Sequence, residues 1–204
     1  MAKVWELAGK ARTDFADMVA GLSDEQMQAE TLCTNWTPHH VLGHLTGFVD
    51  VGLPAFFFNI AKNGFNFDKA SMAAATKMTQ RSREDLLTTL RAKATKSSTV
   101  PTFPEELTVA DVAVHTQDVR RPLGLEGQLD DAVLRSALAF VAEHKMSKLL
   151  TGRDPQAVKI VATDLDLTIG DGPVIEGAGE AILLAMVNRP THDELTGDGV
   201  DLFR

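Results

Sequence analysis

The sequence predicts a mainly α-helical protein, with a helical bundle over residues 1–153 and a small α+β region over residues 154–204. Two observations support this division. Up to residue 153, apolar residues recur at helical spacing between capping, proline and glycine breaks. From residue 159 to 170, apolar and polar residues alternate as they do in a strand, and turn residues follow. With 204 residues, the chain can bury a substantial core.

The helical part divides at recognisable start and stop residues. Thr37 can cap a helix and Pro38 suits its first position, so this helix should run toward Asp50. Pro54 either kinks that helix or begins the next one. Four further long helices are expected: over residues 3–22, over 70–96 with a restart near Ser82, from Thr108 to Arg121, and from Asp130 until Gly152 ends it. A short helix is expected to start at the capping box of residues 23–26, and a loop is expected from Ser97 to Pro104.

The end of the chain mixes strand and helix patterns. Residues 159–170 read as one strand, and the turn Asp171-Gly172-Pro173 leads to an answering strand at residues 174–176. A helix over residues 179–187 and a short strand over residues 200–203 complete this region.

Composition excludes several classes of function. The net charge of -8 argues against nucleic acid as the main partner, because phosphate binding needs a basic surface. Cys33 is the only cysteine, so no internal disulfide and no cysteine-rich zinc site are expected. The start of the chain does not resemble a signal peptide, and the longest apolar run is about half of the ~20 residues that a membrane helix needs. We therefore expect a cytoplasmic protein without a membrane span.

Two helix starts carry residue types that bind metals. Residues four apart on a helix lie on one face, so Asp111 and His115 should point the same way, as should His40 and His44. Two histidines and one carboxylate are the ligand set of many catalytic zinc and non-haem metal sites. Helices that are distant in sequence can build such a site between their inward faces in a bundle. His44, Asp111 and His115 are therefore the candidate ligands of one divalent metal ion.

Each of these residues also has a purely structural interpretation. A carboxylate three residues after Thr108 can form part of a helix cap, and His115 among valines can be an ordinary core histidine. His39 and His40 lie in the first turn of their helix and are interpreted as bystanders. Cys33 has no basic neighbour in sequence and is interpreted as an incidental thiol. The phenylalanines are expected to fill core, with an apolar substrate pocket as the alternative: Phe56, Phe57, Phe58, Phe65 and Phe67.

Three parts of the sequence carry a family resemblance. The first runs from Gly21-Leu-Ser-Asp-Glu-Gln to Asn35-Trp-Thr-Pro-x-x-Val-Leu-Gly-His-Leu, and the second is His115-Thr-Gln-Asp-Val-Arg-Arg-Pro-Leu-Gly124. The third is the tail, with Ala162-Thr-Asp-Leu-Asp, Gly170-Asp-Gly-Pro, Glu180-Ala-Ile-Leu-Leu-Ala and Leu195-Thr-Gly-Asp-Gly199. In this order they resemble the DinB-like, mycothiol-dependent maleylpyruvate isomerase family over nearly the whole chain.

The resemblance implies a DinB-like up-down four-helix bundle with a small α/β part after it. It also implies a metal site whose ligands fall on His44, Asp111 and His115. The acid of the isomerase is a glutamate, and here it is an aspartate, one methylene shorter. Asp118, three residues after His115, is the candidate for a supporting partner or substitute ligand.

The chemistry that the resemblance implies is thiol activation. A divalent cation, zinc or nickel, would lower the pKa of bound mycothiol, and the thiolate would add to a double bond, allow rotation and leave. Isomerisation or transfer of a thiol to a small electrophile are the leading reactions. Arg120 and Arg121 are candidates for binding anionic groups of the thiol cofactor or substrate; the alternative is that they neutralise a helix C-terminus.

Residue types alone also fit two other functions. One is a metal-dependent hydrolase, in which the ion activates water and no thiol takes part. The other is a non-catalytic bundle that binds a metal or small ligand and forms a homodimer through its helix faces.

Overall fold

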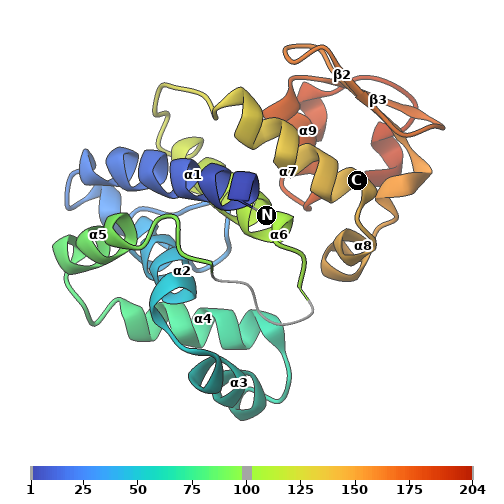
Figure 1. Cartoon of the computed structure of the whole chain (residues 1–204). Helices are drawn as coiled ribbons and strands as arrows, with labels where there is room; N and C mark the ends of the chain where they lie inside the picture. The colour runs from blue at the N-terminus through green and yellow to red at the C-terminus, as the bar shows by residue number, and fades with distance from the viewer. Residues whose placement is uncertain (1, 98–102, 204) are drawn as a thin grey trace. The chain divides into compact units, whose positions relative to one another are not determined.

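The computed structural model describes residues 2–97 and 103–203, and most of these residues are helical (Figure 1). The chain forms two compact units. The first unit contains the residues up to Thr108 and those from Asp118 to Glu126; the second contains Val109–Gln117 and Gly127–Arg204. The predicted fold class, mainly α with a small C-terminal α+β region, is confirmed. The predicted domain boundary at residue 153 stays a prediction.

The first unit is built around one buried helix, α2. The helices of this unit are α1 (Ala2–Ala20), the 3-10 helix η1 (Gln26–Gln28), α2 (Pro38–Asp50), α3 (Leu53–Lys62), α4 (Phe67–Met78) and α5 (Arg83–Ala92). Helix α2 packs against α1, α4 and α5, as the blue, cyan and green ribbons of Figure 1 show. Val41, Leu42, Leu45 and Val49 supply its buried apolar side chains. Such burial contributes roughly 1.5–3 kcal/mol per side chain.

The local start signals of these helices were predicted well. Thr37 caps α2 and Pro38 opens it, and Pro54 lies in the first turn of α3. The expected restart at Ser82 is the N-cap of α5, where the Ser82 hydroxyl accepts a hydrogen bond from the Asp85 N–H. The helix expected from residue 70 begins earlier, because the Asn66 side chain caps α4. Most of the loop predicted from residue 97 to 104 lies outside the described residues.

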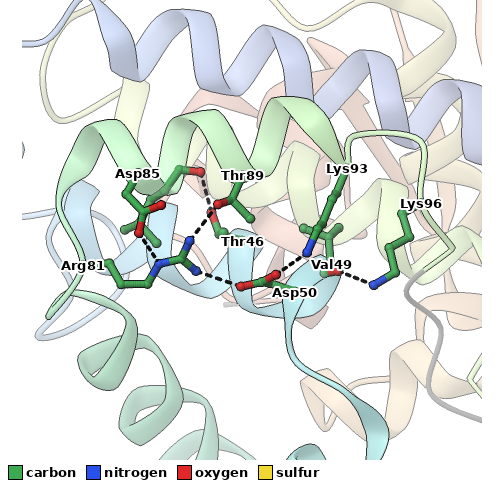
Figure 2. Close-up of polar contacts among 9 residues, drawn as sticks. Thr46, Val49, Asp50, Arg81, Asp85, Thr89, Lys93 and Lys96 are labelled. Atoms are coloured by element: carbon green, nitrogen blue, oxygen red, sulfur yellow. Dashed lines mark hydrogen bonds and ion pairs between the residues drawn. The ribbon is translucent and has the colours of Figure 1, made fainter.

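A polar network ties the C-terminal end of α2 to α5 (Figure 2). The Asp50 carboxylate accepts hydrogen bonds from Lys93 Nζ and, at 2.8 Å, from Arg81 Nη1. Arg81 also donates to Asp85 Oδ2 at 2.6 Å and to Thr89 Oγ1 at 2.7 Å. The bond from Lys93 is the largest of the effects that lower the pKa of Asp50 below its usual value. The ionised carboxylate therefore anchors the end of α2 at neutral pH.

Helix α6 (Glu106–Arg120) contributes residues to both units. It starts at Glu106, so the prediction that Thr108 caps it is wrong. The Leu107 and Thr108 N–H groups donate to the carbonyls of Pro104 and Glu105, and the first turn therefore forms upstream of Thr108. Its predicted end before Pro122 is confirmed. Buried residues lie on nearly every side of the helix, including Val112, Ala113, Thr116, Gln117 and Asp118. A helix buried in this way needs polar partners for each of its polar side chains.

The second unit combines helices with a three-stranded sheet. Its further helices are α7 (Asp131–Glu143), α8 (Lys145–Thr151) and α9 (Gly179–Met186), with 3-10 segments at Pro155–Ala157, His192–Glu194 and Val200–Phe203. Its strands are β1 (Lys159–Ala162), β2 (Leu167–Ile169) and β3 (Val174–Gly177), in the order β2-β1-β3. Helix α9 packs against β1, β3 and α7. Gly152 ends α8 in the left-handed conformation, as predicted.

Three details of this unit differ from the sequence prediction. The expected single strand over residues 159–170 is an antiparallel pair, β1 and β2, in which Ile160 faces Ile169 across the ladder. The strand expected to answer it, β3, exists but runs parallel to β1, with Ile175 beside Ile160. Residues 200–203 form a 3-10 helix in place of a strand. In each case the observed structure depends on residues outside the segment, which the local sequence pattern does not reveal.

Candidate metal centre

The first half of the candidate site lies on α2, whose start is fixed by a histidine-containing capping box. The Thr37 side chain accepts a hydrogen bond from the His40 N–H, and the Thr37 N–H donates to His40 Nδ1 at 3.3 Å. Burial lowers the pKa of His40, which favours the neutral ring that this bond requires. His40, interpreted from sequence as a bystander, therefore has a structural role one turn before His44.

His44 is buried and held from three sides. Its ring makes edge contacts with Trp36 and Phe48, at centroid distances of 5.0 and 4.9 Å. On α4, the Ser71 hydroxyl lies 3.1 Å from His44 Nδ1. A histidine that meets an oxygen through one ring nitrogen is well suited to ligate a metal through the other, because the hydrogen bond fixes its tautomer and orientation. His44 therefore has the support that a metal ligand needs.

The approach of α4 to His44 depends on a glycine. A Cβ added at Gly43 would lie 2.9 Å from Met78 Cβ and 3.1 Å from the Ala75 carbonyl oxygen. Helix α4 therefore packs against α2 with only a hydrogen atom of Gly43 between the backbones, which brings Ser71 within reach of His44.

The second half of the candidate site is a pair of residues on α6. Asp111 Oδ1 lies 3.6 Å from His115 Nε2, so the two side chains meet on one face of the helix, as their spacing of four residues predicts. Both side chains are mostly shielded from solvent, with exposed fractions of 27% and 12%. Asp111 lies in the second turn of α6, because that helix begins at Glu106. Helix capping therefore does not account for Asp111.

Asp118 has a partner that the sequence did not predict. Its Oδ2 accepts a hydrogen bond from the Cys33 thiol at 3.2 Å, and its backbone carbonyl accepts one from the Leu32 N–H at 3.0 Å. Asp118 is fully buried. Cys33, interpreted as an incidental thiol, thus helps to hold the segment before α2 against the end of α6 within the first unit.

The predicted site residues are divided between the two units. The structure brings Asp111 and His115 together in the second unit, whereas His44 belongs to the first. Each offers one ligand atom of the kind that divalent metals bind, a ring nitrogen or a carboxylate oxygen. Arg120 ends α6 and Arg121 follows it, both half-buried. The roles of all five residues in binding a metal or cofactor stay predictions.

Two supporting residues could not be found from sequence reasoning. Ser71 lies 27 positions after His44, on a helix that carries no other sign of chemistry. Trp36 stands just before the predicted helix cap, where a hydrophobic residue is common, and this could have suggested that it packs on the first turns of α2.

Comparisons with known proteins agree on one family. Residues 8–120 match the family model described as the mycothiol maleylpyruvate isomerase N-terminal domain. No match is found among the curated proteins. A crystal structure of the mycothiol-dependent maleylpyruvate isomerase has a TM-score of 0.62 and 13% identity, and covers 96% of this chain and 92% of that chain. A histidine-to-alanine mutant of that enzyme gives the same score and coverage at 12% identity.

The solved structures, at these identities, establish a shared fold. The family model establishes more, because it spans over half of the chain and includes both α2 and α6. None of the helices in residues 2–97 and 103–203 is long and apolar enough to cross a membrane. The chain therefore belongs to the mycothiol maleylpyruvate isomerase family.

Proposed function

We propose that this chain is a metal-dependent and mycothiol-dependent enzyme, an isomerase or a thiol transferase that acts on a small electrophile. The observation that carries the proposal is the family match over residues 8–120, which contains every proposed metal ligand. The two similar structures are named as mycothiol-dependent maleylpyruvate isomerases, and this supports the isomerase as the leading reaction. We also propose a cytoplasmic location, because free thiols persist in reducing compartments.

The proposed metal ligands are His44, Asp111 and His115, around one divalent cation, zinc or nickel. Their chemistry fits such an ion, because two imidazoles and one carboxylate leave coordination positions open for another molecule. The contact between His44 Nδ1 and Ser71 supports ligation through Nε2. The meeting of Asp111 with His115 on α6 supports a second and third ligand on one helix face.

In this proposal the metal supplies thiol activation: a bound cation lowers the pKa of a coordinated thiol, so that the nucleophilic thiolate forms near neutral pH. The protein's own groups orient the reactants. Ser71 holds the ring of His44, and the apolar rings of Trp36 and Phe48 keep water away from it. Arg120 and Arg121 are proposed to bind anionic groups of the thiol or substrate.

Metal analysis tests the ligand set directly. Protein purified without chelator and reloaded with zinc or nickel should hold a stoichiometric amount of metal, and His44→Ala and His115→Ala should each abolish it. Asp111→Asn should weaken metal binding, because a neutral amide oxygen replaces the charged carboxylate donor. His39→Gln on α2 and Glu106→Gln on α6 are matched controls that should retain the metal. Wild-type protein that takes up neither ion would refute the proposal.

Thiol binding separates the remaining functions. Calorimetric titration should show saturable binding of mycothiol to the metal-loaded protein, and none to the metal-free protein or with glutathione. Metal binding without thiol binding would instead favour the hydrolase or the non-catalytic bundle. Arg120→Gln and Arg121→Gln test the proposed cofactor contacts, since each should weaken mycothiol binding while leaving the metal content unchanged.

A further inference from the structure

Helix α3, the turn that follows it and the first residue of α4 expose a set of aromatic rings. Phe57, Phe58, Phe65 and Phe67 are between 52% and 74% exposed, and we call these four residues the aromatic patch. The sequence expectation that they fill the core is therefore wrong. Ile60 is the only buried residue of α3, because α4 is the main packing partner of this helix. Figure 1 shows α3 at the outer side of α4.

Local hydrogen bonds join the segments that carry the four rings. The Phe65 N–H donates to the Ile60 carbonyl at 3.0 Å, which folds the turn back on the last turn of α3. Asn59 Nδ2 donates to the Ala70 carbonyl at 2.7 Å and joins α3 to the first turns of α4. Phe65 has a φ of 59°, a left-handed conformation that bulky residues rarely adopt. The turn thus holds the Phe65 ring outward, toward solvent.

The exposed area of the aromatic patch is large for a monomer. A phenylalanine side chain has about 200 Å² of surface to bury, so the four rings together expose about 500 Å². That value approaches the upper end of the largest apolar patch on a typical monomer, roughly 300–600 Å². Two such patches in contact would bury about 1,000 Å² in total, which is the lower bound for a specific protein–protein interface.

The charges around the patch favour contact with a copy of itself. Between Val51 and Phe67 the only charged residue is Lys62, at the end of α3. The segment that carries the patch therefore brings no carboxylate of its own to the contact. Asp68, the exposed neighbour of Phe67 in the first turn of α4, has to stay in water at the contact's edge, and the flexible stem of Lys62 lets its ammonium group do the same. An anionic lipid surface is a poorer partner, because the chain carries a net charge of -8.

We propose that the aromatic patch is the contact surface of a homodimer, in which α3 and its following turn pack against the same residues of a second copy. Such a contact is isologous, since one patch serves both partners, and it closes at two copies. The small area makes the dimer a reversible one that forms at sufficient protein concentration. The proposal is independent of the metal site, because no residue of the patch is a proposed ligand.

Sedimentation velocity over a wide range of protein concentration tests the dimer. Wild-type protein should shift from monomer to dimer as concentration rises. Phe58→Ser and Phe65→Ser should each weaken the association by about thirtyfold or more, the effect of removing a central aromatic anchor. Leu149→Ser is the matched control: Leu149 is 81% exposed on α8 in the second unit, and its replacement should leave the dimer intact.

Circular dichroism should show native helix content in all three variants, because the changed side chains are exposed. Wild-type protein that stays monomeric at every concentration overturns the proposal. So does a dimer that survives Phe58→Ser and Phe65→Ser together. A last experiment uses vesicles of phosphatidylserine and phosphatidylcholine. A monomeric protein that binds them through the patch would identify a lipid surface, and not a second copy of the chain, as the partner of the patch.

Discussion

Helices α2 and α3 are consecutive, both rich in apolar residues, and both have a proline in their first turn, yet they differ in almost everything else. Helix α2 is buried along most of its length, is capped by a side chain and carries His44. Helix α3 has a single buried residue and begins at Gly52 without a side-chain cap. Apolar composition therefore did not decide burial here. The number of neighbouring helices decided it, because α2 packs against several helices and α3 packs mainly against α4.

The largest expected difference between the two helices is the cost of removing a leucine. Leu42→Ala on α2 should lower the free energy of unfolding by about 2–5 kcal/mol, because Leu42 is fully buried and its loss leaves a cavity. Leu53→Ala on α3 should cost about 1 kcal/mol or less, since Leu53 is 42% exposed. Urea unfolding of both variants at low protein concentration measures the two costs. Equal costs would show that α3 is as well packed as α2.

A glycine pair on α2 tests the close approach of α4. Gly43→Ala should destabilise the protein by about 1–3 kcal/mol, because the added methyl group meets Met78 and the Ala75 carbonyl. Gly47→Ala should instead stabilise it by about 0.5–1 kcal/mol, because its methyl group would have an ordinary contact with Met78 at 3.8 Å and alanine favours the helix. Thermal unfolding shows whether each substitution raises or lowers the stability of the protein. A stabilising Gly43→Ala would contradict the tight α2–α4 contact.

The smallest expected effects concern the two helix starts. Thr37→Ala removes the cap of α2 and should cost about 1 kcal/mol of unfolding free energy. Gly52→Ser supplies a capping oxygen to α3 and should add a few tenths of a kcal/mol. Urea unfolding of the two variants in parallel should show a lower free energy of unfolding for Thr37→Ala and a higher one for Gly52→Ser. Thr37→Ser, which keeps a hydroxyl, is the control for the first change and should stay close to wild type.

Features of the fold that depend on neighbouring residues in sequence were predictable. The bounds of α2 followed from Thr37 and Pro38, and the end of α8 followed from Gly152, because caps and breaks act within one turn. The break between β1 and β2 was missed, although Asp166 takes a left-handed φ of 47° that aspartate tolerates in turns. An alternating pattern does not reveal where a strand reverses.

The candidate site shows the same limit at the level of single residues. The meeting of Asp111 and His115 was predictable, because a helix brings residues four apart together. The contacts of Ser71 with His44 and of Cys33 with Asp118 were not, because each joins elements far apart in the chain. The exposure of Phe58 and Phe65 was missed for a related reason: an apolar residue is buried only if another element covers it.

The histidine in the capping box of α2 has a consequence for acid conditions. The Thr37 N–H and a solvent proton compete for the same lone pair on His40 Nδ1, so protonation of the ring removes that hydrogen bond. Burial lowers the pKa of His40 below 6.5, so the unfolded chain takes up the proton first. The stability that this residue contributes is fully present above pH 6.5 and is lost as the pH falls below that value. Helix α8 begins in a related way, because His144 Nδ1 accepts a hydrogen bond from the Met146 N–H at 3.1 Å, so a histidine side chain also takes part in the first turn of a helix of the second unit.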